Sequence, residues 1–105
     1  MADRIQQLRE FVNEDPKDPF NRYALALEYQ KVDLQKAVEI FELLLRDHPD
    51  YLPTYYQLGK LYLELTENEK AMQVFDSGIE KAQKQNDVKA LKELKAARQE
   101  LLSDE

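Results

Sequence analysis

The chain has 105 residues, no cysteine and a formal net charge of −6. This length predicts one domain with a moderate core, and the lack of cysteine excludes disulfides, thiolate catalysis and zinc sites of the cysteine type. The acidic balance argues against non-specific nucleic-acid binding, which needs a basic footprint. With only 2 Gly and 4 Pro, the composition favours a helical protein over an all-β one.

The N-terminal residues lack the apolar segment of a signal peptide, and no run of the sequence reaches the length of a membrane span. We therefore expect a cytoplasmic protein that does not bind membranes.

The first three predicted helices cover the N-terminal half. A helix over about 3–14 has a stripe at spacings of three and four, formed by Ile5, Leu8, Phe11 and Val12. The second begins at Asp18-Pro19 with Asp18 as its N-cap, because Asp caps well and Pro suits the first helical position. Its predicted buried stripe is Phe20, Tyr23, Ala24 and Leu27. After a turn at 31–33, in which Asp33 is a candidate cap, the third helix carries Ala37, Ile40, Phe41, Leu44 and Leu45.

Three more helices are predicted in the C-terminal half, and no segment has the alternation of a strand. One runs from near Pro53 to about residue 65, and the next carries Ala71, Met72, Phe75 and Ile79 and continues to about 85. Asn86-Asp87 offers a turn and an N-cap. The last helix, about 88–102, has one apolar stripe made of Val88, Leu91, Leu94, Ala97, Leu101 and Leu102.

The sequence repeats at an offset of about 34 residues. At 34, Ala37 matches Ala71 and Phe41 matches Phe75. At 35, the first helices match better, because Phe20 meets Tyr55 and Ala24 meets Gly59. The simplest interpretation is one extra residue in the first unit's turn, around 31–33.

The second unit reads Tyr55, Leu58, Gly59, Tyr62, Ala71 and Phe75. This spacing resembles the tetratricopeptide repeat, a 34-residue helix–turn–helix with the pattern W-x2-L-G-x2-Y, then A-x3-F, then P. The resemblance implies an all-α fold, an α-solenoid of antiparallel helix hairpins with about six helices. It divides a single domain, 1–105, into a half-repeat helix at 1–17, repeat units at 18–50 and 51–85, and a capping helix at 86–105.

No catalytic constellation stands out. His48 is the only histidine, and its place at a helix C-terminus, where a cation is favoured, indicates a structural role. Gly59 and Gly78 cannot make a glycine-rich phosphate loop. We therefore expect no enzymatic activity, no cofactor and no metal ligand.

The resemblance implies that the first helix of each hairpin lines a concave groove that binds a peptide or a partner protein. The candidate groove residues are Asn21, Leu25, Glu28, Tyr29, Tyr56, Lys60, Leu63 and Glu64. Some members of the family hold a carboxylate tail with paired Lys and Asn residues; Asn21 and Lys60 match such sites, but Glu28 and Glu64 add opposing charge. The alternative is a scaffold module that forms a homodimer through its exposed helix faces. The lysines of the last two helices alternate with acids, which favours a solvated face over a nucleic-acid site.

Overall fold

The structure is a computed structural model that describes residues 2–103. The elements are α1 (Ala2–Glu14), α2 (Pro19–Gln30), α3 (Leu34–Asp47), α4 (Pro53–Glu64), α5 (Asn68–Gln85) and α6 (Val88–Ser103). Six helices and no strand within this range confirm the predicted all-α class.

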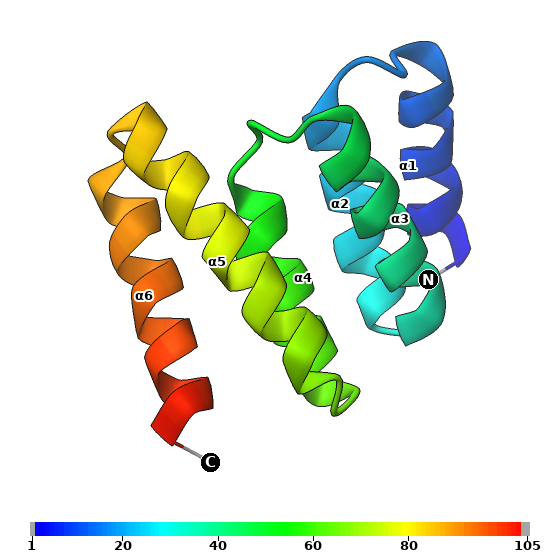
Figure 1. Ribbon diagram of the computed structural model, residues 1–105. Helices are drawn as coiled ribbons and strands as arrows, with labels where there is room; N and C mark the ends of the chain where they lie inside the picture. Colours follow the sequence, from blue (N-terminus) through cyan, green and yellow to red (C-terminus); the bar gives the residue numbers. More distant parts are fainter. Residues whose placement is uncertain (1, 104–105) are drawn as a thin grey trace. The chain divides into compact units, whose positions relative to one another are not determined.

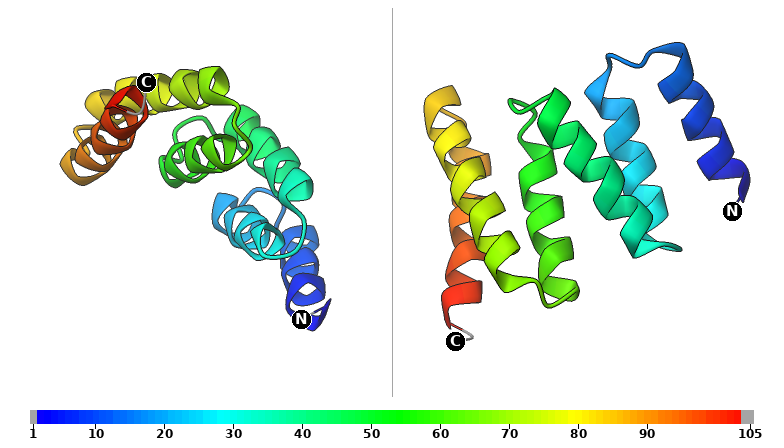
Figure 2. Two further views of the ribbon diagram at one scale, coloured as in Figure 1. Left: turned by 90° about the horizontal axis from the view of Figure 1, so that it is seen from below. Right: turned by 45° about the vertical axis from the view of Figure 1, so that its right-hand side comes forward.

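The chain divides into two compact units between Tyr51 and Leu52. In unit 1, α2 packs against both α1 and α3. In unit 2, α5 packs against α4 and α6, and α4 also contacts α6. Successive helices within each unit run in opposite directions and are joined by short turns (Figures 1 and 2). Each unit therefore contains one complete helix hairpin and one further helix packed against it.

Three aspartates cap helix N-termini, as the sequence predicts. The Asp18 carboxylate accepts a hydrogen bond from the Phe20 amide at 2.9 Å. Asp33 accepts from the Lys36 amide at 3.1 Å, and Asp87 accepts from the Ala90 amide at 3.0 Å. Each bond satisfies an amide that has no partner within its own helix, which typically stabilises a helix by about 1 kcal/mol.

The core of unit 2 follows the predicted repeat positions. The residues Tyr55, Leu58, Gly59, Tyr62, Ala71 and Phe75 are all buried. Gly59 is required by close approach, because a Cβ there would lie 2.3 Å from Cε1 of Phe75. At Gly78 a Cβ would lie 2.7 Å from Cβ of Tyr55 and 3.1 Å from Cδ1 of Leu94. Because Gly59 and Gly78 have no side chains, α4, α5 and α6 can pack closely.

The predicted buried stripe of α2 is wrong. Leu25 and Ala26 are buried, whereas Phe20 is 59% exposed and Ala24 and Leu27 are half-buried. The physical reason is that α2 carries apolar residues on several sides, so periodicity alone does not select the buried one. The motif Leu25-Ala26-x-x-Tyr29 matches Leu58-Gly59-x-x-Tyr62 at an offset of 33, which is the alignment that burial supports.

The predicted extra residue in the turn of unit 1 is also wrong, because the longer turn lies in unit 2. The Tyr29 carbonyl accepts from the Asp33 amide at 2.7 Å, four residues on. The matching Tyr62 carbonyl accepts from the Glu67 amide at 2.8 Å, five residues on. Thr66 has a φ of 58°, in the left-handed region that β-branched residues rarely adopt. This backbone conformation accommodates the additional residue.

The apolar stripes of the two end helices are only partly buried. In α1, Leu8 is buried but Phe11 is exposed. In α6, the stripe is buried at Leu94, Ala97 and Leu101 and exposed at Val88 and Leu102. Each end helix therefore leaves large apolar side chains in solvent.

Candidate interaction surface

The outward side of α4 carries all four of the groove residues predicted in unit 2. Tyr56 and Leu63 are half-buried, and Lys60 and Glu64 are exposed. The Lys60 ammonium lies 5.8 Å from the centroid of the Tyr56 ring, a cation–π contact between residues one turn apart. The contact holds an aromatic face and a positive charge side by side on one helix.

On α2, the four groove residues predicted in unit 1 are placed less uniformly. Asn21, Glu28 and Tyr29 are half-buried, but Leu25 is only 8% exposed and belongs to the core. Both carboxylate oxygens of Glu28 accept from Nζ of Lys31 at 3.2 Å. Asn21, Glu28 and Tyr29 therefore retain partial access to a partner, and Leu25 does not.

Sequence reasoning missed the outward apolar side of α2, which consists of Phe20, Ala24 and Leu27 and is called here the α2 face. The three residues follow at spacings of four and three, so they share one side of the helix. At offset 33, Ala24 and Leu27 match Gln57 and Lys60 of α4. The signal that would have found this face is the Leu-Ala-x-x-Tyr motif, which assigns the opposite side of α2 to the core.

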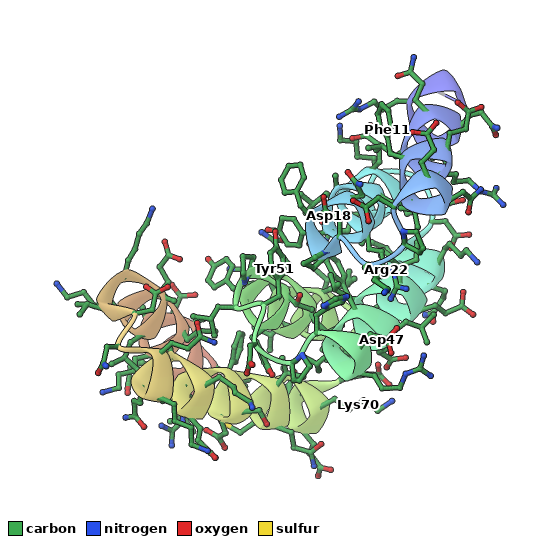
Figure 3. The ribbon with its side chains drawn as sticks, turned by 90° about the horizontal axis from the view of Figure 1, so that it is seen from above. Phe11, Asp18, Arg22, Asp47, Tyr51 and Lys70 are labelled. Atoms are coloured by element: carbon green, nitrogen blue, oxygen red, sulfur yellow. The ribbon has the colours of Figure 1, made fainter. Side chains whose placement is uncertain are left out.

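Tyr23 borders the α2 face and anchors it to the rest of unit 1. Its ring packs edge-on against Phe41 of α3, with centroids 6.1 Å apart, and against Tyr51, with centroids 5.7 Å apart. Burial raises the pKa of the Tyr51 hydroxyl, and the nearby Tyr23 and the negative charge of Asp18 raise it further. Figure 3 shows Asp18 and Tyr51 close together at the start of α2.

An ion-pair network joins α2 to α3 on another side of unit 1. Asp47 accepts from Nε of Arg46 at 2.9 Å and from NH1 of Arg22 at 2.7 Å. Figure 3 shows Arg22 and Asp47 directed toward one another. The hydrogen bond from Arg46, followed by that from Arg22, lowers the pKa of Asp47 to about 2. Two guanidinium groups thus offset the charge of this carboxylate.

Within residues 2–103, no group of three or more His, Asp or Glu side chains is arranged to hold a metal ion. Helices long and apolar enough to span a membrane are likewise absent from this range. His48 follows the last residue of α3 as its C-cap, as its sequence position predicts.

Comparison with known proteins gives a family match and several structural matches. The family model described as tetratricopeptide repeat matches residues 28–97. The crystal structure of a tetratricopeptide repeat domain protein from Salinibacter ruber is 43% identical, with a TM-score of 0.79; the match covers 84% of this chain and 99% of that one. A search of curated proteins gives no significant match.

A more distant structure shares the fold. The TPR2B domain of yeast Sti1, in a complex with pHsp70, is 14% identical with a TM-score of 0.87. That match covers 96% of this chain and 82% of the Sti1 domain. At this identity, the likeness concerns the arrangement of the helices only.

Proposed function

Because the chain belongs to the tetratricopeptide repeat family, we propose that it is a non-enzymatic module that binds a peptide or a partner protein through the outward sides of α2 and α4. Proteins of this family are generally scaffolds for protein–protein interaction. We also propose the repeat division 18–50 and 51–85, with the flanking helices completing the array because isolated hairpins bury too little surface.

The observation that carries this proposal is the composition of the α4 side. Tyr56 supplies rigid contact area at a low cost in side-chain entropy, and Lys60 beside it supplies a charge. Leu63 and Glu64 extend the same side by one turn. Accessible aromatic and aliphatic groups among charges are typical of surfaces that bind peptides.

The test is quantitative co-purification of partners from the native cells with the wild-type chain and with a Tyr56→Ala/Lys60→Glu variant. We expect partners to be lost with this variant. The matched control is Lys89→Glu, which makes the same charge change at an exposed lysine of α6 in the same unit. Retention of every partner by a folded Tyr56→Ala/Lys60→Glu protein would contradict the proposal.

Self-association is the second candidate function, and the exposed apolar residues of α6 favour it. Val88 is 63% exposed and Leu102 is 43% exposed, and their spacing of 14 residues places both on one side of α6. Sedimentation analysis of the wild type and of Val88→Ser/Leu102→Ser tests it. A strict monomer at high concentration would rule this function out.

A further inference from the structure

Helix α1 corresponds in the repeat to α3, the second helix of a hairpin. The two helices match at an offset of 33 residues, at which Leu8 meets Phe41, and both of these side chains are buried. The matching carbonyls of Phe11 and Leu44 each accept a hydrogen bond from the amide four residues on, at 3.0 Å and 2.8 Å. The repeat pattern therefore predicts a first helix beside α1, in the way that α2 lies beside α3.

The side of α1 that such a first helix would cover is open. At Gly78, the matching position of α5, a Cβ would lie 2.7 Å from Cβ of Tyr55 on α4, the first helix of that hairpin. Leu44, the matching residue of α3, is fully buried. Phe11 occupies this position in α1 and is 47% exposed. The described residues thus leave room for one more helix beside α1, and an aromatic ring faces that space.

The open side of α1 consists of four exposed residues at spacings of three, four and three, called here the α1 stripe: Arg4, Gln7, Phe11 and Glu14. These spacings put them on one side of the helix. Within the described part of the chain, neither Arg4 nor Glu14 has an ion-pair partner. Arg9 lies on nearly the opposite side of α1, and Glu10 accepts a hydrogen bond from Gln6 at 3.4 Å.

The α1 stripe is complementary to itself when two copies of the helix run antiparallel. Its four residues are spaced symmetrically about the middle of the stripe, so Arg4 lies opposite Glu14 of the second copy and Gln7 lies opposite Phe11. Two pairs of opposite charge then form by symmetry, and each aromatic ring packs against an aliphatic stem. The two helices of a hairpin also run antiparallel, so a second α1 has the direction that the missing first helix would have.

We propose that α1 docks against α1 of a second copy of this chain as an antiparallel, two-fold symmetric pair. Such a contact uses the same surface on both copies and closes at two. One helix from each copy buries less surface than the roughly 1,200 Å² of a stable complex, so the dimer is weak, with a Kd on the order of 100 µM. The pair uses neither α4 nor α6, so it is independent of partner binding at α4 and is a different surface for self-association from α6.

The test is sedimentation equilibrium of the full chain at low salt, from about 10 µM to about 1 mM. Phe11→Ser removes the ring, and Arg4→Glu and Glu14→Arg each put like charges opposite one another. Each of the three variants should weaken the dimer about tenfold. The matched control is Arg9→Glu, which makes the same charge change on the other side of α1 and should leave the Kd unchanged. Because all four side chains are exposed, the variants should fold normally.

An equimolar mixture of Arg4→Glu and Glu14→Arg tests the antiparallel geometry directly. In the mixed dimer, the new carboxylate at position 4 of one chain faces the new guanidinium at position 14 of the other, and the second pair consists of the original Glu14 and Arg4. The mixture should therefore dimerise with about the wild-type Kd, although each variant alone associates about tenfold more weakly. Added salt should reduce this difference, because exposed charges are screened.

Three outcomes would overturn the inference: a monomer throughout this concentration range, a dimer unchanged by Phe11→Ser, or a mixture that associates no better than its components. A dimer lost in Val88→Ser/Leu102→Ser but kept in the α1 variants would also overturn it, while leaving α6 as the surface for self-association. Partner binding at α4 is tested separately by co-purification, so it stands or falls independently of these results.

Discussion

Helices α2 and α4 both span 12 residues and begin with Pro, yet they turn different chemistry outward. On α2 the outward residues are Phe20, Ala24 and Leu27, whereas the matching positions of α4 are Pro53, Gln57 and Lys60. Inside, the two helices agree, with Leu25-Ala26 matching Leu58-Gly59. The core motif is therefore shared, and the outward side is where the two repeats diverge.

The two hairpins also fill their cores by different means. Buried Tyr55 packs where Gly78 leaves space for it. At the matching positions unit 1 has Arg22 and the fully buried Leu44. An arginine in place of the tyrosine needs a carboxylate partner, which Asp47 supplies at 2.7 Å. In unit 1, the larger side chain of Leu44 on α3 thus compensates for the lack of an aromatic ring at Arg22 on α2.

The largest expected effects come from the two buried phenylalanines. Phe41→Ala and Phe75→Ala should each lower the free energy of unfolding by about 3–5 kcal/mol, because both side chains are fully buried. Native-state hydrogen exchange would assign the loss: amides of α2 and α3 for Phe41→Ala, and amides of α4 and α5 for Phe75→Ala. Equal loss of protection in both units with either variant would show that the chain unfolds as a single cooperative unit.

The next largest effect tests the corrected orientation of α2. Leu25→Ala should cost about 2–3 kcal/mol, because the side chain is buried. Phe20→Ala should change stability by no more than about 0.5 kcal/mol, because its ring lies mostly in solvent. Chemical denaturation of both variants provides the measurement, and the reverse ranking would restore the orientation predicted from sequence.

A smaller effect is expected at the close helix contact of unit 2. Gly59→Ala should lower stability by about 1–2 kcal/mol, because overpacking against Phe75 outweighs a gain of about 1 kcal/mol in helix propensity.

Replacing the ring of Phe75 with a smaller side chain provides the control for this contact. In a Phe75→Leu background the same Gly59→Ala change should be neutral or stabilising, so the two substitutions should be strongly non-additive in thermal unfolding. Additive effects would show that the ring does not set the requirement for glycine.

The smallest effect is the pH dependence of the Asp47 network. Because the folded-state pKa of Asp47 is lowered to about 2, its contribution is present above the unfolded value near 3.8 and is lost as pH falls through about 2. Thermal unfolding of Asp47→Asn should therefore show a deficit at neutral pH that shrinks between pH about 4 and pH about 2. A deficit of constant size across this range would mean that the carboxylate charge is irrelevant.

Helix positions and caps could be predicted from local signals, because capping aspartates and prolines act on the adjacent residues. The core of unit 2 was predictable as well, since Gly59 and its flanking aromatics occur in one unambiguous pattern. In α2, Phe20, Leu25 and Leu27 lie on different sides of one helix, and packing against α1 and α3 decides which is buried. Leu25 was wrongly placed among the groove residues of unit 1 for the same reason, because it was assigned relative to the wrong core.

The longer turn at Thr66 has a consequence for engineering. One residue corresponds to a rotation of about 100° around a helix, so the two hairpins cannot be exchanged at a constant spacing of 34. A chimera spliced at that spacing would place a polar side of one helix where the other carries its core. Joining the hairpins at the carbonyls of Tyr29 and Tyr62, and transferring each turn whole with its own helix, would keep both cores in phase.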